Sequence, residues 1–259
     1  MRSKTSPQIA FDDVGDREPA LLALPGWCAQ RTAFRPMYSH LERRVLAVDW
    51  RGHGGSEAVT GEFGVAELVE DALAVMSAAG AERVIPLATA HAGWVAIELR
   101  RRLGADRVPG VVLVDWMVLG APPPFMSGLA ALQNVEQWQA MRDRLFAMWT
   151  EGVSSPEVQA FVRTMGHFGF DMWSRAGREI ANAFAAQPVP LEALAPLECP
   201  TLHVYAQPAD PAFLAAQEDF ARKHPWFRVQ RVSAHSHFPT IEAAAEVAAA
   251  VESFARDLA

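Results

Sequence analysis

The fold of this chain is decided by the stretch Leu87-Ala88-Thr89-Ala90-His91-Ala92-Gly93-Trp94. An apolar run leads into it and a helical pattern follows, so the chain is expected to turn sharply at residue 90. When such a turn presents a nucleophile, small residues must stand two positions to either side, and Ala88 and Ala92 meet that requirement. The central residue is Ala90, where Ser, Cys or Asp would stand. We expect the turn to form, while covalent catalysis from residue 90 is excluded.

Short apolar runs on either side of this turn predict the buried strands of a parallel sheet. They cover residues 20–24, 45–48, 84–87, 111–114 and 201–205, and an alternating run at 227–232 predicts a last strand nearer an edge. Apolar residues at helical spacing lie between them, over residues 65–79, 91–103, 211–223 and 240–258. Strands and helices alternate, which predicts an α/β fold with a doubly wound, mostly parallel sheet.

The alternation stops between Pro122 and Pro196, where the pattern predicts helices only. We therefore expect an α/β core over residues 1–121 and 189–259 and an inserted helical cap over residues 122–188. Aromatic and methionine side chains crowd this segment and its borders. Most of them would pack the cap onto the sheet, but together they predict an apolar pocket beneath it. The set includes Trp116, Phe125, Trp149 and Trp173.

Composition and charge exclude several classes of function. The 259 residues carry a net charge of -7, which argues against a nucleic-acid partner. The segment Met1–Pro7 lacks the apolar core of a signal peptide, and no apolar run approaches the roughly 20 residues of a membrane span. We expect a soluble, cytoplasmic monomer or homodimer with no membrane partner. The run Arg100-Arg101-Arg102 is expected to solvate a helix end.

Metal and nucleotide sites are also disfavoured. Cys28 and Cys199 are the only cysteines, which suits a reducing compartment and is too few for a zinc site. The glycines of Asp49-Trp50-Arg51-Gly52-His53-Gly54-Gly55-Ser56 lack the Lys and Ser/Thr of a phosphate-binding loop and the following helix of a dinucleotide fingerprint. We interpret that stretch as a structural turn and expect no metal.

His237 is the candidate general base, because it follows the last predicted strand and begins the final helix. Such a histidine needs an orienting acid that fixes its tautomer and stabilises the imidazolium. Asp115 ends the run 111–114, and Asp210 follows the run 201–205, so both stand at the carboxyl edge of the sheet. Spacing alone leaves the two acids open. As alternative roles, Asp115 could cap a turn and Asp210, before Pro211, could cap a helix.

Two loops can supply N–H donors to a negatively charged oxygen. The first loop follows the predicted strand at residues 20–24 and reads Leu24-Pro25-Gly26-Trp27-Cys28. A loop at this place in the fold can donate one N–H. The second would come from His91, the residue after the turn position. Such a pair stabilises an oxyanion whatever its origin. The two N–H donors can therefore still bind an anion when residue 90 carries no nucleophile.

Together these motifs resemble one branch of the α/β-hydrolase superfamily, the cofactor-independent 3-hydroxy-4(1H)-quinolone or quinaldine 2,4-dioxygenases. The resemblance covers almost the whole chain. The stretches that carry it are Pro25-Gly26-Trp27-Cys28, Asp49-Trp50-Arg51-Gly52-His53, His91-Ala92-Gly93-Trp94-Val95, Val114-Asp115-Trp116, Leu145-Phe146-Ala147-Met148-Trp149, His224-Pro225-Trp226-Phe227 and His237-Phe238-Pro239.

The resemblance implies a dyad of His237 with Asp115, which decides between the two acids. It implies that the histidine deprotonates the substrate's 3-hydroxyl group and that the organic anion reacts directly with O2, releasing carbon monoxide and an N-acylanthranilate. It implies no metal, flavin or other cofactor, and as partners only an aromatic heterocyclic substrate and O2. Trp27 and His91 would line the oxyanion and oxygen region, and Trp149 would wall the aromatic ring.

Three positions depart from the family's pattern. Ala90 replaces a serine that contacts substrate, Thr89 stands in place of a histidine, and Ala29 stands where a histidine can occur. One lost hydrogen bond is worth about 0.5 to 1.5 kcal/mol. Because all three replacements shrink a side chain, we expect room for a bulkier ring substituent such as a long 2-alkyl chain. The remaining expected substrate contacts are Trp116, Phe125, Trp173 and Phe238.

Two other functions stay open at this stage. His237 could activate water in an esterase or lactonase that works by general base catalysis. Alternatively, the chain could be a ligand-binding protein that kept the pocket and lost the chemistry, although the retained pair of His237 and Asp115 argues against that.

Overall fold

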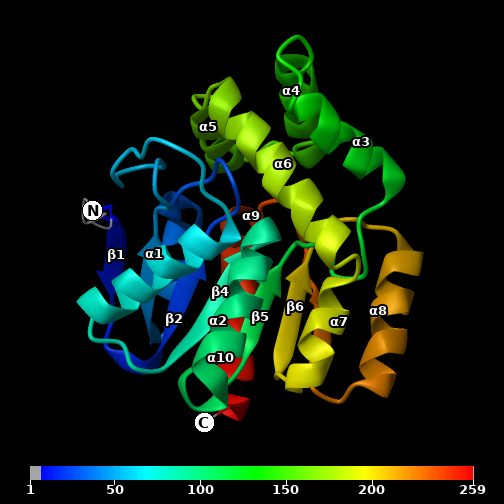
Figure 1. Cartoon of the computed structure of the whole chain (residues 1–259). Helices are drawn as coiled ribbons and strands as arrows, with labels where there is room; N and C mark the ends of the chain where they lie inside the picture. The colour runs from blue at the N-terminus through cyan, green and yellow to red at the C-terminus, as the bar shows by residue number, and fades with distance from the viewer. Residues whose placement is uncertain (1–6, 259) are drawn as a thin grey trace.

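The computed structural model describes residues 7–258. Residues 1–6, on which the expectation of no signal peptide partly rests, and residue 259 lie outside this range. A seven-stranded sheet forms the centre, in the order β1-β3-β2-β4-β5-β6-β7 (Figure 1). Only β1 is antiparallel to its neighbour, which confirms the mostly parallel sheet. The strands are β1 (Phe11–Val14), β2 (Arg17–Leu24), β3 (Arg43–Val48), β4 (Val84–Thr89), β5 (Val111–Val114), β6 (Thr201–Tyr205) and β7 (Phe227–Arg231).

Helices cover both faces of the sheet. On one face lie α1 (Val65–Ala78), α2 (Gly93–Arg107) and α7 (Pro190–Leu194), and on the other lie the 3-10 helix η1 (Arg31–His40) and α10 (Ala244–Asp257) (Figure 1). The remaining core helices are η2 (Ala90–Ala92), η3 (Ala195–Leu197), α8 (Pro211–Lys223) and α9 (Pro239–Glu242). The single helix expected over 240–258 is therefore wrong, because the backbone leaves helical geometry at Ala243 (φ -122°, ψ 40°).

Between β5 and β6 the chain forms helices only, as the sequence predicts. These cap helices are α3 (Pro123–Leu132), α4 (Trp138–Trp149), α5 (Pro156–Met165) and α6 (Phe170–Ala186), and they lie over one end of the sheet (Figure 1). Proline in the first turn begins α3 and α5, and the Ser155 side chain caps α5 by accepting from the Val158 N–H. The division into core and cap at residues 122 and 188 stays a prediction.

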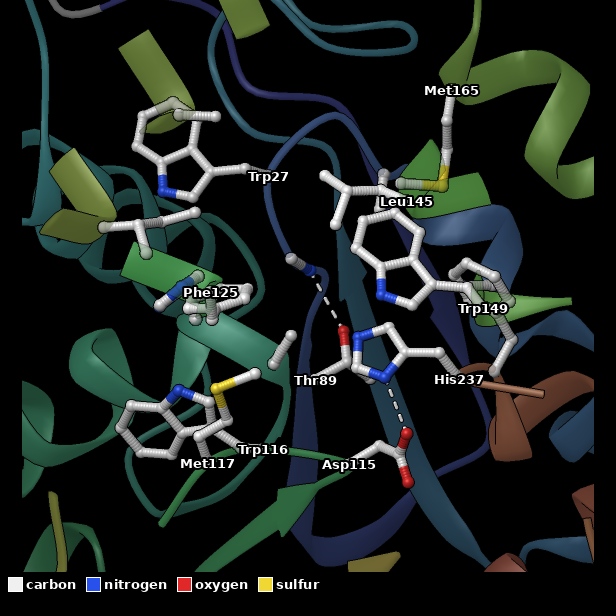
Figure 2. A pocket seen from close by; sticks show the side chains of 18 of the residues that line it. Trp27, Thr89, Asp115, Trp116, Met117, Phe125, Leu145, Trp149, Met165 and His237 are labelled. Carbon is white, nitrogen blue, oxygen red and sulfur yellow. Dashed lines mark hydrogen bonds and ion pairs between the residues drawn. The ribbon is translucent and has the colours of Figure 1, made fainter. Parts of the chain in front are cut away.

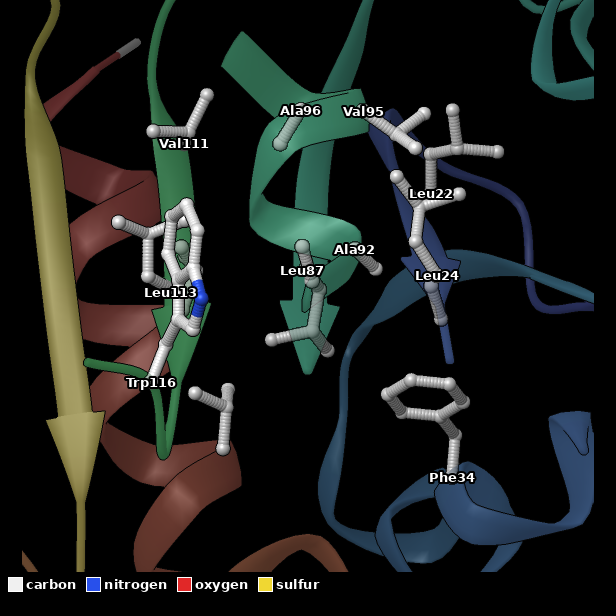
Figure 3. Packing of buried hydrophobic residues seen from close by; sticks show 14 of the residues in the cluster. Leu22, Leu24, Phe34, Leu87, Ala92, Val95, Ala96, Val111, Leu113 and Trp116 are labelled. Carbon is white, nitrogen blue, oxygen red and sulfur yellow. The ribbon is translucent and has the colours of Figure 1, made fainter. Parts of the chain in front are cut away.

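Packing between the sheet and α2 positions the turn at residue 90. Leu22, Leu87 and Leu113 from three adjacent strands are fully buried in this layer (Figure 3). Burying a side chain of this size stabilises the fold by about 1.5 to 3 kcal/mol. Trp116 approaches the start of α2 so closely that a Cβ at Gly93 would lie 2.2 Å from its Cζ3 atom. The residue there must therefore be glycine.

The arginine run corrects one expectation. Arg101 and Arg102 pair with Glu98 at the surface of α2. Arg100 is buried instead, and its guanidinium donates to the Val108 carbonyl (2.6 Å) and to the Leu197 carbonyl (3.3 Å). The expectation of a solvated run is wrong here because successive helical residues point in different directions.

Within residues 7–258, none of the helices combines the length and the apolar character required to cross a membrane.

Candidate active site

The turn predicted at residue 90 is present, formed where β4 ends at Thr89 and passes through η2 into α2. Ala90 takes a left-handed conformation, with φ of 47°. Ala88 and Ala92, two positions to either side, are both buried. A non-glycine residue held in this region costs on the order of 1 to 3 kcal/mol and is typical of functional sites. The geometry that exposes a nucleophile is thus kept around a methyl group.

Across the sheet edge, His237 and Asp115 form the expected pair. The distance between His237 Nδ1 and Asp115 Oδ2 is 2.6 Å (Figure 2). Asp115 follows β5 with φ of 48°, and its other oxygen accepts from the N–H groups of Ala206 (2.6 Å) and Gln207 (3.0 Å). The carboxylate is therefore anchored at the end of β6. With Nδ1–H donated to Asp115, His237 Nε2 is the basic nitrogen.

The cap holds His237 from the opposite side. Its backbone N–H donates to the Trp149 carbonyl at 3.0 Å, and the two rings stack with centroids 5.1 Å apart and planes at 24°. Asp210, the other candidate acid, is exposed, and its side chain accepts from the Ala212 N–H as the N-cap of α8. The structure therefore brings His237 together with Asp115 and leaves Asp210 in its capping role.

The loop after β2 leaves one N–H group free to bind an anion. Gly26 N–H donates to Thr89 Oγ1 (3.0 Å), Cys28 N–H donates to His53 Nε2 (3.1 Å) and Ala29 N–H donates to the Gly26 carbonyl (3.3 Å). Within residues 7–258 the backbone N–H groups of Trp27 and His91 have no hydrogen-bond acceptor. Trp27 and His91 both line the same cavity. An oxyanion requires two such donors, and that role for Trp27 and His91 stays a prediction.

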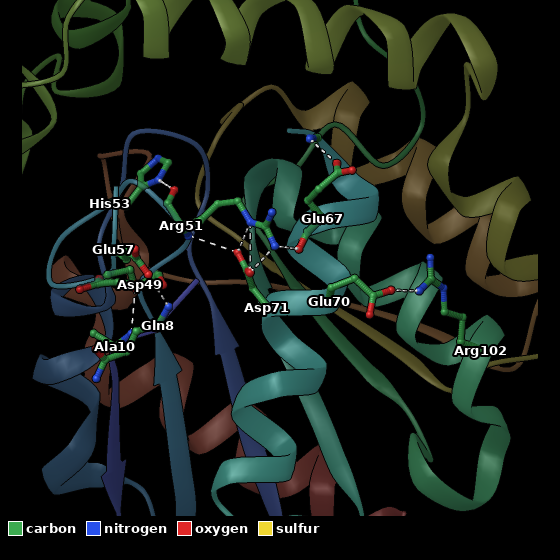
Figure 4. Close-up of polar contacts among 12 residues, drawn as sticks. Gln8, Ala10, Asp49, Arg51, His53, Glu57, Glu67, Glu70, Asp71 and Arg102 are labelled. Carbon is green, nitrogen blue, oxygen red and sulfur yellow. Dashed lines mark hydrogen bonds and ion pairs between the residues drawn. The ribbon is translucent and has the colours of Figure 1, made fainter. Parts of the chain in front are cut away.

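His53 supports this loop from the stretch 49–56. Its Nδ1–H donates to the Arg51 carbonyl at 3.0 Å, which leaves Nε2 to accept from Cys28 (Figure 4). Burial lowers the pKa of His53 to about 4, so the ring is neutral near pH 7 and can act as an acceptor. Asp49 accepts from the Gly55 N–H and from the Arg31 N–H, which ties the turn together.

His91 is a second buried histidine, beside the turn. Burial lowers its pKa to about 3, and the nearby His237 contributes in the same direction. Its ring packs against Phe184, with centroids 5.6 Å apart, and against Trp116. Its Nδ1 atom is buried without a partner in the described part of the chain. A ring held neutral in this way is a weak base, so His237 stays the predicted base of the cavity.

A cavity beneath the cap helices joins these groups, with an unfilled volume of about 980 Å³ that includes its opening to solvent. All the residues expected at the site line it, namely Trp27, Ala29, Thr89, Ala90, His91, Asp115, Trp116, Phe125, Trp149, Trp173, His237 and Phe238. Their roles stay predictions. Within the described residues, no three His, Cys, Asp or Glu side chains gather as metal ligands would.

Sequence reasoning missed the aliphatic wall of the cavity, which the cap helices supply. It consists of Leu129, Leu132, Leu145 and Ile180, with Phe184 beside them. The apolar stripe of each cap helix signals that one face is buried. It does not show whether that face meets another helix or an open cavity.

The chain is similar to known proteins over almost its whole length. The chain matches the model of the Alpha/beta hydrolase family over residues 21–250. It is 38% identical over 248 residues to the 2-heptyl-3-hydroxy-4(1H)-quinolone dioxygenase of Mycobacteroides abscessus, covering 93% of this chain and 92% of that protein. It is 32% identical to the 1H-3-hydroxy-4-oxoquinoline 2,4-dioxygenase of Pseudomonas putida, covering 95% of each.

A solved structure is similar over the same length. It is that of an AqdC variant in complex with its substrate, the Pseudomonas quinolone signal. The TM-score is 0.91 at 36% identity, and the match covers 95% of this chain and 94% of that one.

Proposed function

This chain belongs to the α/β-hydrolase family and, within it, to the 3-hydroxy-4-quinolone 2,4-dioxygenases, and from that premise we propose that it cleaves the ring of a 2-alkyl-3-hydroxy-4-quinolone. It is an enzyme that incorporates O2. The observation that supports the proposal most directly is the pair of His237 and Asp115 in an apolar cavity whose turn residue, Ala90, carries no nucleophile. A base is available there and a covalent acyl intermediate at residue 90 is not.

The first step is proton transfer. His237 Nε2 takes the proton of the substrate's 3-hydroxyl group, and the imidazolium that forms is stabilised by the Asp115 carboxylate 2.6 Å away. Because Asp115 is itself held by two backbone N–H groups, it keeps the ring oriented during the transfer. The free N–H groups of Trp27 and His91 then bind negative charge on oxygen.

Ring cleavage requires O2 and no other reactant. The substrate anion supplies the electrons, and O2 bonds to C2 of the ring. The outer oxygen closes on C4, the O–O bond and the two carbon bonds to C3 break, and C3 leaves as carbon monoxide. One oxygen atom remains on each of C2 and C4, which gives an N-acylanthranilate. The electrons balance between the anion and O2, so the proposed reaction requires no cofactor.

The 2-alkyl group is the finer part of the proposal. The aliphatic wall of the cap offers the apolar surface that a long chain would bury, at about 0.8 kcal/mol for each CH₂ group. Ala29 and Ala90 line the cavity with methyl groups, where the family pattern can have a histidine and has a serine, respectively. We expect turnover to improve as the 2-alkyl chain lengthens from methyl to heptyl. If activity is highest on the unsubstituted ring, the preference for a 2-alkyl chain is wrong, while the ring-cleaving reaction stands.

The test of the reaction separates deprotonation from oxygenation. Protein is mixed with 2-heptyl-3-hydroxy-4-quinolone without O2, and the absorption shift of the anion is recorded. O2 is then admitted and carbon monoxide is assayed. We expect both signals. If neither appears, and a panel of esters and lactones is hydrolysed instead, the chain is a hydrolase that works through the same base.

His237→Ala is the decisive variant, and His235→Ala is its matched control. His235 is two residues away and its side chain is 78% exposed, outside the cavity. Loss of a general base should lower kcat by roughly 10² to 10⁴-fold. We expect that loss only in His237→Ala. Equal activity of the two variants would remove His237 from the reaction.

A further inference from the structure

We propose that Thr89 is a positioning residue: its hydroxyl holds the Gly26 N–H, which restricts rotation of the backbone at Gly26 so that the next N–H along the chain, that of Trp27, faces the reacting oxygen. This inference rests on the proposed function and adds a role that the sequence does not predict. From the sequence, Thr89 is expected to contact the substrate. The hydrogen bonds give its oxygen a different partner, the backbone of the loop after β2.

The hydroxyl group bridges two neighbouring strands at the edge where the site lies. β2 and β4 are parallel neighbours, with Leu24 in register with Ala88. Just beyond this pair, Thr89 Oγ1 accepts from the Gly26 N–H at 3.0 Å (Figure 2). The same oxygen lies 3.5 Å from the Leu24 carbonyl, toward which it can donate. The hydroxyl is therefore engaged with the loop on both sides.

Gly26 is the residue in this loop that most needs such a constraint. Glycine has no side chain to restrict its backbone, so its peptide groups rotate more freely than those of other residues. Its N–H is held by Thr89 and its carbonyl by the Ala29 N–H. One residue further, the Cys28 N–H is held by His53. The Trp27 N–H lies between the held N–H groups of Gly26 and Cys28. Among the backbone N–H groups of residues 26–29, it alone has no acceptor in the described part of the chain.

Preorganisation of this kind has a direct effect on rate. A donor that already points at the developing charge needs no rearrangement when the charge forms, and removing such a donor costs on the order of 10² to 10³-fold in kcat. Removing the group that orients the donor should cost less. We expect about a tenfold loss, the equivalent of one typical hydrogen bond.

The test compares Thr89→Val with Thr89→Ser. Valine keeps the shape of threonine and removes the hydroxyl, whereas serine keeps the hydroxyl. We expect Thr89→Val to lower kcat about tenfold while KM for 2-heptyl-3-hydroxy-4-quinolone changes less than about threefold. Thr89→Ser should restore kcat to within about threefold of wild type. A direct substrate contact would instead raise KM.

Thr201→Val is the matched control for the loss of a buried hydroxyl. Thr201 is fully buried at the start of β6, where its hydroxyl donates to the Cys199 carbonyl at 2.8 Å, far along the strand from the site. It should lower the melting temperature without changing kcat. If both valine variants lose activity equally, the effect of Thr89→Val is structural and the proposal is overturned.

A second measurement does not depend on turnover. Hydrogen exchange of the Gly26 amide should become at least several-fold faster in Thr89→Val and return toward the wild-type rate in Thr89→Ser. Unchanged exchange at Gly26 would overturn the positioning role. If exchange responds as expected but the wild-type protein cleaves no quinolone, the proposed function fails and the contact between Thr89 and the loop stands.

Discussion

At the scale of single residues, the two ring nitrogens of His237 have separate tasks. Nδ1 donates to Asp115, and Nε2 has no partner among residues 7–258 and is left for the substrate. The histidine could be predicted from its place after the last strand. Spacing alone could not choose the acid, because Asp115 and Asp210 both follow strands. The family resemblance implied Asp115, and the path of the chain places that carboxylate beside the ring.

Asp115→Asn should damage catalysis more than its small change in shape suggests. The amide oxygen can still accept from Ala206 and Gln207, which turns the NH₂ group toward His237 Nδ1. That nitrogen must then accept, so the proton moves to Nε2 and the base is lost. We expect kcat to fall roughly 10² to 10⁴-fold, by analogy with the loss of the correct tautomer in serine proteases.

Asp115→Ala should lose less than His237→Ala, since the base itself remains. Anaerobic anion formation, read from absorbance, is the direct measurement for both aspartate variants. Asp115→Asn with nearly wild-type anion formation would show that the tautomer does not limit the reaction.

At the scale of elements, strong local patterns were sufficient for the buried strands and insufficient elsewhere. The continuous apolar runs of β2 to β6 predict strands because both faces are covered. β1 was missed because Phe11-Asp12-Asp13-Val14 has two central charges and becomes a strand only by pairing with β3 at the edge. The break at Ala243 was missed because neither Gly nor Pro marks it.

Arg100 gives a prediction at this scale, because it links α2 to the segments around Val108 and Leu197. Arg100→Ala removes two hydrogen bonds and leaves buried carbonyl groups unpaired, which should lower the free energy of unfolding by about 1 to 3 kcal/mol. Arg101→Ala is the control, since that side chain is 52% exposed and its pair with Glu98 is worth about 0 to 1 kcal/mol. Urea unfolding measures both. Equal midpoints for the two variants would mean that the buried contacts of Arg100 add nothing.

At the scale of the whole molecule, buried neutral histidines recur around the site. His203 accepts from the Trp116 N–H through Nε2, and its Nδ1–H donates to Gln217. Burial lowers the pKa of His203 to about 4, as it does for His53, and the pKa of His91 to about 3. All three imidazole rings are buried in the fold in their uncharged form. The fold therefore depends on their staying unprotonated.

This arrangement predicts that stability falls in mild acid. The folded-state pKa of each of the three histidines lies below the ordinary value of 6.5, so below about pH 6.5 the unfolded chain binds more protons. The free energy of unfolding should decrease as pH falls from about 6.5 toward 4. Each group contributes to the loss at about 1.4 kcal/mol per pKa unit, and the three contributions have the same sign. Urea midpoints at pH 7.5, 6 and 5 measure it, and a constant or rising midpoint would contradict the prediction.

Ala90 has a practical consequence for how such a protein is found. Fluorophosphonate probes label serine hydrolases by reacting with the hydroxyl group at this turn, and the left-handed residue here carries only a methyl group. A labelling survey of a proteome would therefore pass over this chain, while a survey by fold would count it among the hydrolases. Screens for carbon monoxide release or for loss of the quinolone's absorbance are the assays that would detect it.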